Sequence, residues 1–306
     1  MTEFQRYLAE EIAIDHADGI ISRREALRRL GLLGLSFTAA SALLVGFAPA
    51  EAAASEPATP AAPSAGAMAT EPLGTPAVPT KAITFRGPVG RTLMGAWAPA
   101  RRARGGVLVI HENRGLNDHI RSVVGRFAAS GYSALAVDLL SEEGGTGAFS
   151  DSAEATAALG SVPPQRFVAD MKAAISELRR RLPGRRLAAV GFCFGGGMVW
   201  LLLASRASRL AAAVPFYGPF PEGGDLSGSK AAVLGIYAEL DSRVNATRPA
   251  AQAALKTAGL RHQIVTFRGA DHAFFNDTGP RFHPAAAAQA YRRVLDWFER
   301  HVDMPS

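Results

Sequence analysis

The only cysteine of this 306-residue chain lies in a glycine-rich turn typical of a catalytic nucleophile. Cys193 is the centre of Gly191-Phe192-Cys193-Phe194-Gly195-Gly196-Gly197. The apolar run 187–190 before it predicts a buried strand, and the apolar run 198–204 after it predicts a helix. A strand, a tight turn and a helix form a nucleophile elbow, which favours attack of the Cys193 thiolate on a carbonyl carbon. The alternative is a buried structural cysteine beside a βα turn.

Two further side chains follow Cys193 in the order that such a nucleophile needs. Asp241 comes just after a predicted strand at 232–237, and His272 comes just after a predicted strand at 263–267. Parallel strands end at one edge of a sheet, so we expect His272 to reach Cys193 as a base and Asp241 to orient His272. The alternatives are an Asx-turn role for Asp241, with Glu239 as the competing acid, and a structural role for His272.

A fourth loop at the same predicted edge carries polar residues. The stretch 111–117 follows a predicted strand at 106–110. In this arrangement the backbone N–H of Phe194 is expected to be the first oxyanion donor and that of Asn113 the second. Glu112 and Arg114 form either a solvated ion pair or a pair of groups facing the substrate. His111 and His119 flank the motif, and either could line a pocket.

These motifs together resemble the dienelactone hydrolase family of the α/β-hydrolase superfamily, from about Lys81 to the C-terminus. The resemblance lies in the cysteine elbow, Glu-x-x-Gly-x-Asn at 112–117, Glu-x-Asp-x-x-Val at 239–244 and His-x-Phe-Phe at 272–275. It implies that Cys193, Asp241 and His272 form the triad. It also implies that Glu112 interacts with the resting thiol and helps to activate it when substrate enters.

The chain departs from the family pattern at two positions. The family arginine that binds the substrate carboxylate corresponds here to Asn276, and Arg114 stands where an apolar residue is usual. Arg114 and Asn276 are therefore the candidate substrate-binding residues. Three explanations of these departures are open. Arg114 has taken over the recognition of a substrate carboxylate, the substrate is a different one, or Arg114 pairs with Glu112.

The elements that must position these residues indicate an α/β fold. Strand-like and helix-like stretches alternate from 83 to 302, which predicts a mostly parallel, doubly wound sheet with helices on both faces. Helices are expected near 117–130, 164–182, 247–258 and 284–301, and the glycine- and alanine-rich segment 141–165 is expected to be a mobile cover over the site. No Cys/His cluster has metal-ligand spacing, so we expect neither a metal nor a cofactor.

The charge pattern does not favour nucleic acid as a partner. The formal net charge is +6, and the densest basic cluster is Arg179 to Arg181 with Arg185 and Arg186. This cluster is expected at the C-terminal end of a helix, where cations complement the helix dipole. No aromatic residues alternate with this cluster, so it lacks the stacking platform of a nucleic-acid binding surface. We expect a monomer or weak dimer that binds a small-molecule ester or lactone.

The first 80 residues indicate a leader and a linker before the domain at 81–306. Arg23-Arg24 precede an apolar run from 30 to 47, and small-residue sites that predict cleavage near Ala50 or Ala52 follow at 48–50 and 50–52. Residues 1–50 are therefore expected to be a twin-arginine signal, read by the twin-arginine export machinery. Residues 51–80, rich in Ala and Pro, are expected to be a disordered linker. An uncleaved membrane anchor and a core helix are the alternatives for the apolar run.

The sequence thus predicts an exported, periplasmic or extracytoplasmic hydrolase. It would cleave an ester or lactone resembling carboxymethylenebutenolide through a thioester at Cys193. Two other functions remain open, namely a non-catalytic binding protein on this fold and a redox-sensing thiol protein.

Overall fold

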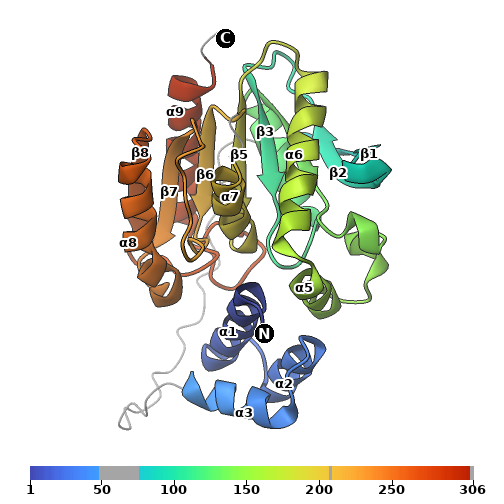
Figure 1. Ribbon diagram of the computed structural model, residues 1–306, viewed down its shortest axis with the longest axis vertical. Coiled ribbons are helices and arrows are strands. Elements are labelled where there is room, and N and C mark those ends of the chain that lie inside the picture. Colours follow the sequence, from blue (N-terminus) through green and yellow to red (C-terminus); the bar gives the residue numbers. More distant parts are fainter. Residues whose placement is uncertain (48–75, 207–208, 304–306) are drawn as a thin grey trace, which may run out of the picture.

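An eight-stranded sheet forms the centre of the molecule (Figure 1). The computed structural model describes residues 1–47, 76–206 and 209–303. The strand order is β1-β2-β4-β3-β5-β6-β7-β8. Strand β2 is antiparallel to both of its neighbours, and the pairs from β4 to β8 are parallel. The strands are β1 (Lys81–Arg86), β2 (Thr92–Ala98), β3 (Gly105–Ile110), β4 (Tyr132–Val137), β5 (Leu187–Phe192), β6 (Ala212–Phe216), β7 (Ala232–Ala238) and β8 (His262–Phe267).

The central strands are buried along their whole length. Every residue of β3, β4 and β5 is buried, as expected for apolar runs in a parallel sheet that is covered on both faces. Strand β8 at the edge is only partly covered. The predicted α/β class, with a mostly parallel sheet and helices on both faces, is confirmed.

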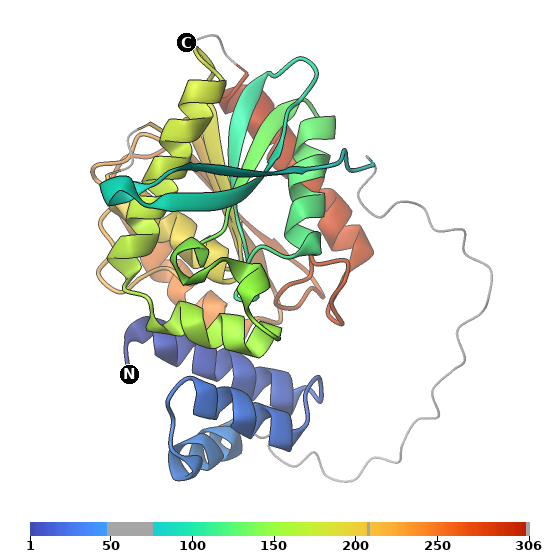
Figure 2. The same ribbon diagram turned by 90° about the vertical axis from the view of Figure 1, so that its right-hand side faces the viewer.

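Five helices of the described chain pack around this sheet. Helices α4 and α9 cover one face, and α6 lies on the other (Figure 2). The predicted helices at 117–130, 164–182 and 284–301 agree with α4, α6 and α9. Helix α8 begins at Ser242 rather than at the predicted Thr247, because the Asp241 side chain caps it. The five are α4 (Asp118–Ala129), α6 (Pro164–Arg181), α7 (Phe194–Ala204), α8 (Ser242–Thr257) and α9 (Pro284–His301).

The segment predicted as a cover contains ordered helical turns. Two short 3₁₀ helices, η2 (Ser141–Glu143) and η3 (Thr146–Ala148), lead into α5 (Ser152–Ser161). The Asp151 carboxylate caps α5 by accepting bonds from the N–H groups of Ala153 and Glu154. Helix α5 packs against two helices from the N-terminal part of the chain.

The predicted leader forms three helices that pack on the domain. These are α1 (Glu3–Ala17), α2 (Arg23–Leu32) and α3 (Phe37–Gly46), with Thr2, Ser22 and Ser36 as their N-caps. They lie at the end of the domain that carries α5 (Figures 1 and 2). Helix α1 buries Leu8 and Ile12, one turn apart, so one face of it belongs to the core.

The two arginines of the predicted signal lie on the outside of this helical group. Arg23 and Arg24 are exposed in the first turn of α2. The apolar run after them is divided between α2 and α3, and both Leu30 and Leu44 are buried. None of the helices in the described ranges combines the length and the apolar character needed to cross a bilayer. The expected cleavage sites, and the linker up to residue 75, lie outside the described residues.

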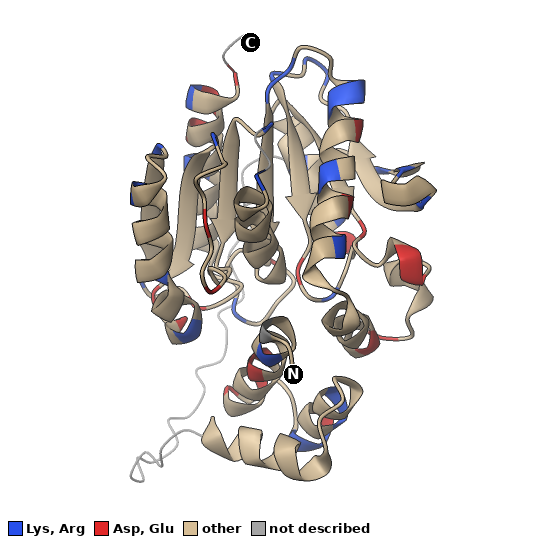
Figure 3. Ribbon diagram, viewed as in Figure 1, with Lys and Arg blue, Asp and Glu red and all other residues tan. Residues whose placement is uncertain are grey.

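Basic residues occur on several elements, including α6, as Figure 3 shows. In the cluster singled out from the sequence, Arg180 and Arg181 both bind the Glu177 carboxylate, at 2.7 Å. Arg179 to Arg181 occupy the last turn of α6, as expected for cations that complement a helix dipole.

Candidate active site

Cys193 adopts the backbone geometry expected of a nucleophile elbow. Its φ of 55° and ψ of −119° lie in a region that L-residues rarely adopt. A Cβ on Gly191 would lie 2.0 Å from the Gly195 carbonyl oxygen, and a Cβ on Gly195 would lie 2.3 Å from the Ile110 carbonyl oxygen. Glycine is therefore required at both positions, because β5, α7 and the end of β3 approach at backbone distance.

The two residues expected to supply the oxyanion donors are Phe194, which follows Cys193 in the chain, and Asn113. Phe194 is the first residue of α7, so its N–H is among those that have no acceptor within the helix. Asn113 lines the same cavity as Cys193. Its carbonyl oxygen accepts a 2.8 Å hydrogen bond from the Thr156 hydroxyl of α5, which holds the loop.

Asp241 and His272 are in direct contact. The Oδ2 atom of Asp241 lies 2.6 Å from Nδ1 of His272, and both side chains are buried. The Oδ1 atom of Asp241 accepts the Val244 N–H at the start of α8, at 3.1 Å. One oxygen of Asp241 thus caps α8 three residues on, rather than forming an Asx turn two residues on, and the other oxygen contacts His272. The Tyr217 ring packs on the imidazole at 5.2 Å between centroids.

The competing candidates from the sequence lie elsewhere. Glu239 is exposed, and its carboxylate accepts the Gly269 N–H at 2.8 Å. His111 is buried and bridges the Glu112 carbonyl oxygen and the Leu139 N–H. His119 lies 3.0 Å from the Asp277 carboxylate. Neither histidine lines the cavity beside Cys193.

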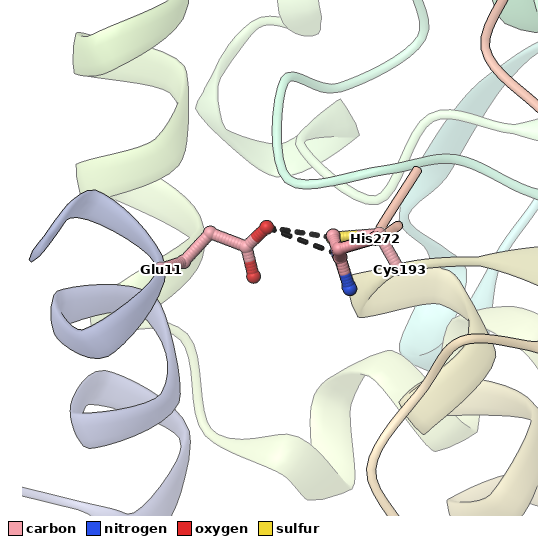
Figure 4. A group of neighbouring side chains, drawn as sticks. All are labelled: Glu11, Cys193 and His272. Carbon is pink, nitrogen blue, oxygen red and sulfur yellow. Dashed lines mark hydrogen bonds and ion pairs between the residues drawn. The ribbon is translucent and has the colours of Figure 1, made fainter. Parts of the chain in front are cut away.

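Two side chains of α1 reach the thiol. The Tyr7 hydroxyl lies 3.3 Å from Cys193 Sγ, and the thiol donates to Glu11 Oε1 at 3.8 Å. The same Glu11 oxygen lies 3.0 Å from Nε2 of His272, and Figure 4 shows it directed at both residues. The other Glu11 oxygen accepts from Arg243 at 2.7 Å. Glu11 thus joins the nucleophile, the histidine and an arginine.

These contacts set the protonation of the site. Burial raises the pKa of the Cys193 thiol, and the negative charge of Glu11 raises it further against the opposing effect of His272. Burial alone would lower the pKa of His272, but the carboxylates of Glu11 and Asp241 hold it well above the ordinary range. Burial would raise the pKa of Glu11, whereas His272 and Arg243 lower it. The surroundings therefore favour a neutral thiol beside an imidazolium, although the helix N-terminus alone would favour the thiolate.

Glu112 and Asn276 form a buried pair. The Asn276 amide donates to Glu112 Oε2 at 2.7 Å, and Glu112 Oε1 is a buried atom without a hydrogen-bond partner among the described residues. The expected contact between Glu112 and the resting thiol is thus replaced by contacts from α1. The alternative pairing of Arg114 with Glu112 does not occur either, because Arg114 is exposed at the rim of the cavity.

A small cavity lies between α1, α2 and the domain. Its volume is about 60 Å³, and Cys193 forms part of its wall. Ligand pockets usually have volumes of roughly 300–1,000 Å³, so this one is small for a substrate. Ala153 and Thr156 of α5 line it, which agrees with the predicted position of that segment over the site. Its charged lining residues are Glu11, Asp15, Glu112, Arg29, Arg114 and Arg281.

Glu11, Cys193 and His272 also bring three potential metal ligands together. One ligand atom from each lies within 4.8 Å of the others. A cation among them would face the Arg243 guanidinium, which already occupies the Glu11 carboxylate at 2.7 Å. The local charge therefore favours an ion-paired resting site over a metal centre.

Sequence reasoning missed Tyr7, Glu11 and Arg243. The signal that could have found the first two is the spacing of Tyr7, Leu8, Glu11, Ile12 and Asp15, which all lie on one buried face of α1. Two carboxylates on such a face indicate buried partners. Arg243 lies two residues after Asp241 and stacks on the Tyr7 ring at 4.2 Å.

Known proteins are similar to this chain in sequence and in fold. The chain is 32% identical over 208 residues to the "Putative carboxymethylenebutenolidase" of Escherichia coli O157:H7, covering 64% of this chain and 76% of that protein. It is 30% identical to the protein of the same description from Methylorubrum extorquens, covering 64% and 72%.

Solved structures of similar fold include two that are described as dienelactone hydrolases. The "Putative Dienelactone Hydrolase" of Klebsiella pneumoniae superposes with a TM-score of 0.63 at 29% identity, covering 72% of this chain and 99% of that one. The dienelactone hydrolase of Anabaena variabilis, at 19% identity and a TM-score of 0.59, covers 73% and 99% and supports the α/β-hydrolase fold. Residues 94–302 match the dienelactone hydrolase family, and the chain therefore belongs to that family of α/β-hydrolases.

Proposed function

We propose that this protein hydrolyses an ester or lactone through a thioester on Cys193. The observation that carries the proposal is the contact of 2.6 Å between Asp241 and His272 beside a strained cysteine elbow, in a chain of this family. Family relatives described as carboxymethylenebutenolidases support a lactone that bears a carboxylate as the substrate class. The exposed guanidinium of Arg114, which lines the cavity, would attract such an anion.

Catalysis would begin when the Cys193 thiolate attacks the carbonyl carbon. The N–H groups of Phe194 and Asn113 would stabilise the oxyanion of the tetrahedral intermediate. The C–O bond then breaks, the imidazolium of His272 protonates the leaving oxygen, and a thioester remains. In the second half, His272 takes a proton from water, the hydroxide oxygen attacks the thioester, and Cys193 leaves as the thiolate.

Glu112 would control how the thiolate forms. Its Oε1 atom is buried and unpaired within the described chain, and Glu112 lines the same cavity as Cys193. It is therefore available to accept the thiol proton when substrate enters, while Asn276 holds its other oxygen at 2.7 Å.

A simple activity assay tests the proposal. The full chain should hydrolyse an activated aryl ester, Cys193→Ala should abolish the activity, and substrate should protect Cys193 from iodoacetamide. Cys193→Ser should retain only weak activity, because the much higher pKa of a serine hydroxyl demands more of His272. Full activity in Cys193→Ala would refute the mechanism.

We also propose that Arg23 and Arg24 direct export. Their exposure in the first turn of α2 supports recognition by a twin-arginine translocase, although α2 and α3 would first have to leave the domain. Changing both residues to lysine should leave the protein in the cytoplasm, as cell fractionation would show. Unchanged export would contradict this role. Full-length protein in the membrane fraction would instead favour an uncleaved anchor.

A further inference from the structure

Helix α1 fills the space in front of the nucleophile. Glu11 lies between His272, at 3.0 Å, and Arg243, at 2.7 Å, and Figure 4 shows how its carboxylate reaches across from α1. Tyr7, one turn earlier, touches the thiol at 3.3 Å. All of these side chains except Arg243 are buried, so α1 shields the nucleophile from solvent.

The Glu11 carboxylate has the position of a reaction product. Hydrolysis of an ester leaves a carboxylic acid beside the cysteine and the histidine. Glu11 places one carboxylate oxygen 3.8 Å from Cys193 Sγ and 3.0 Å from Nε2 of His272. That nitrogen must give a proton to the leaving oxygen and take one from water during catalysis, and Glu11 keeps it in an ion pair instead.

Several contacts hold α1 in this position. Leu8 is fully buried and Ile12 is 4% exposed. Asp15 and Asp18 bind Arg281 of the domain, at 2.8 Å and 2.6 Å. With α1 in place, the cavity at Cys193 measures about 60 Å³, which is small against the roughly 300–1,000 Å³ of ligand pockets. Substrate therefore needs α1 to move.

We propose that α1 is an intramolecular inhibitor whose Glu11 carboxylate occupies the place of the product acid. The enzyme then acts on its substrate only when α1 leaves the site. The effect on catalysis rests on the proposed ester hydrolysis, whereas the masking of the Cys193 thiol does not. A measurement of Cys193 reactivity therefore tests the masking of the thiol separately from the inhibition of catalysis.

The test compares full-length Glu11→Ala with full-length Glu10→Ala. Glu10 is the neighbouring residue of α1, and it makes no ion pair among those found in the described chain. The rate of Cys193 alkylation by iodoacetamide and the turnover of an aryl ester are measured for each. Glu11→Ala should raise both rates about tenfold or more, because it removes one partner of a buried ion-pair cluster. Glu10→Ala should behave as wild type.

A second variant separates release of α1 from the loss of the Glu11 charge. Leu8→Asp places a charge at a fully buried position of α1 and leaves Glu11 intact. It should raise alkylation and turnover as Glu11→Ala does. A thermal unfolding curve that keeps the main transition would show that the domain is still folded.

The outcomes are distinct. An unchanged rate of Cys193 alkylation in both Glu11→Ala and Leu8→Asp would overturn the inference. A lower ester turnover in Glu11→Ala would also overturn it, because Glu11 would then assist catalysis rather than block it. Faster alkylation with no ester turnover in any form would uphold the masking and refute the proposed ester hydrolysis.

Discussion

At the scale of single residues, motif order in the sequence predicted the contact between Asp241 and His272. Strand ends determine where such side chains lie, and the spacing of apolar runs reveals strand ends. Glu11 could not be predicted in the same way. It lies 182 positions before Cys193, and its contact with the thiol depends on how α1 docks, which local periodicity does not encode.

The charge of Glu11 should control the pH at which Cys193 becomes reactive. Glu11→Gln removes an anion that raises the pKa of the thiol, while burial, the opposing charge of His272 and the nearby groups Tyr7, Glu112 and Arg243 remain. Forming the thiolate then costs less, so the midpoint of the alkylation rate against pH should move to lower pH. Stopped-time alkylation followed by mass spectrometry measures this midpoint. A midpoint that stays in place or rises would contradict the assigned electrostatics.

Arg114 should determine the preference for anionic substrates. It lies exposed at the rim of the cavity and does not pair with Glu112, so it is available to a substrate carboxylate. Arg114→Ala should lower kcat/KM for a carboxylate-bearing lactone by roughly 10- to 150-fold, the value of a lost charge-assisted hydrogen bond of about 1.5–3 kcal/mol. Hydrolysis of a neutral ester should change little. Equal losses on the two substrates would refute a role in specificity.

At the scale of elements, the sequence predicted the regular helices and strands well. Helices α6 and α9 have a proline at the start of the apolar periodicity, which marks their first residue. The sequence did not predict the ordered helical turns within 141–165. Helix α5 is held in place by its packing against α1 and α2, which is a tertiary feature. The elbow was predictable because its glycines are needed for close backbone contacts.

Substitution of an elbow glycine should therefore damage the site. A Cβ at Gly195 would lie 2.3 Å from the Ile110 carbonyl oxygen and 2.6 Å from that of His111. Gly195→Ala should lower the free energy of unfolding by about 1–3 kcal/mol and abolish ester turnover. Gly31→Ala in α2 is the control, since nothing lies within 4 Å of the added carbon and stability should rise by up to about 1 kcal/mol. Denaturant melts of the two variants make the comparison, and wild-type stability in Gly195→Ala would contradict the packing described.

At the scale of the whole molecule, the predicted leader packs against the candidate active site. The interpretation of residues 1–50 as a signal rests on the arginine pair and the apolar run, and it assigns no separate role to the first 22 residues. The amphipathic spacing and the buried carboxylates of these residues are explained by packing against the surface of the domain. Arg281, which binds Asp15 and Asp18, belongs to that surface.

Loss of Arg281 should loosen α1 and leave the domain intact. Arg281→Ala leaves the Asp15 carboxylate buried without its cation, which costs about 3–5 kcal/mol for a buried pair. Hydrogen exchange should become faster in α1, while the strands β3 and β5 keep their protection. Arg268→Ala is the control, because Arg268 is almost fully exposed and its ion pair with Glu239 is 4.0 Å long. Unchanged exchange in α1 would mean that Arg281 does not hold the helix in place.

The most direct test of the proposed function is the capture of its covalent intermediate. Full-length Glu11→Ala protein is mixed with an activated aryl ester, quenched in acid and examined by intact mass and peptide mapping. A thioester mechanism predicts a mass increase of one acyl group on Cys193, absent in Cys193→Ala and longer-lived in His272→Ala, because deacylation requires that base. Ester turnover without an acyl group on Cys193, or with the acyl group on another residue, would contradict the mechanism.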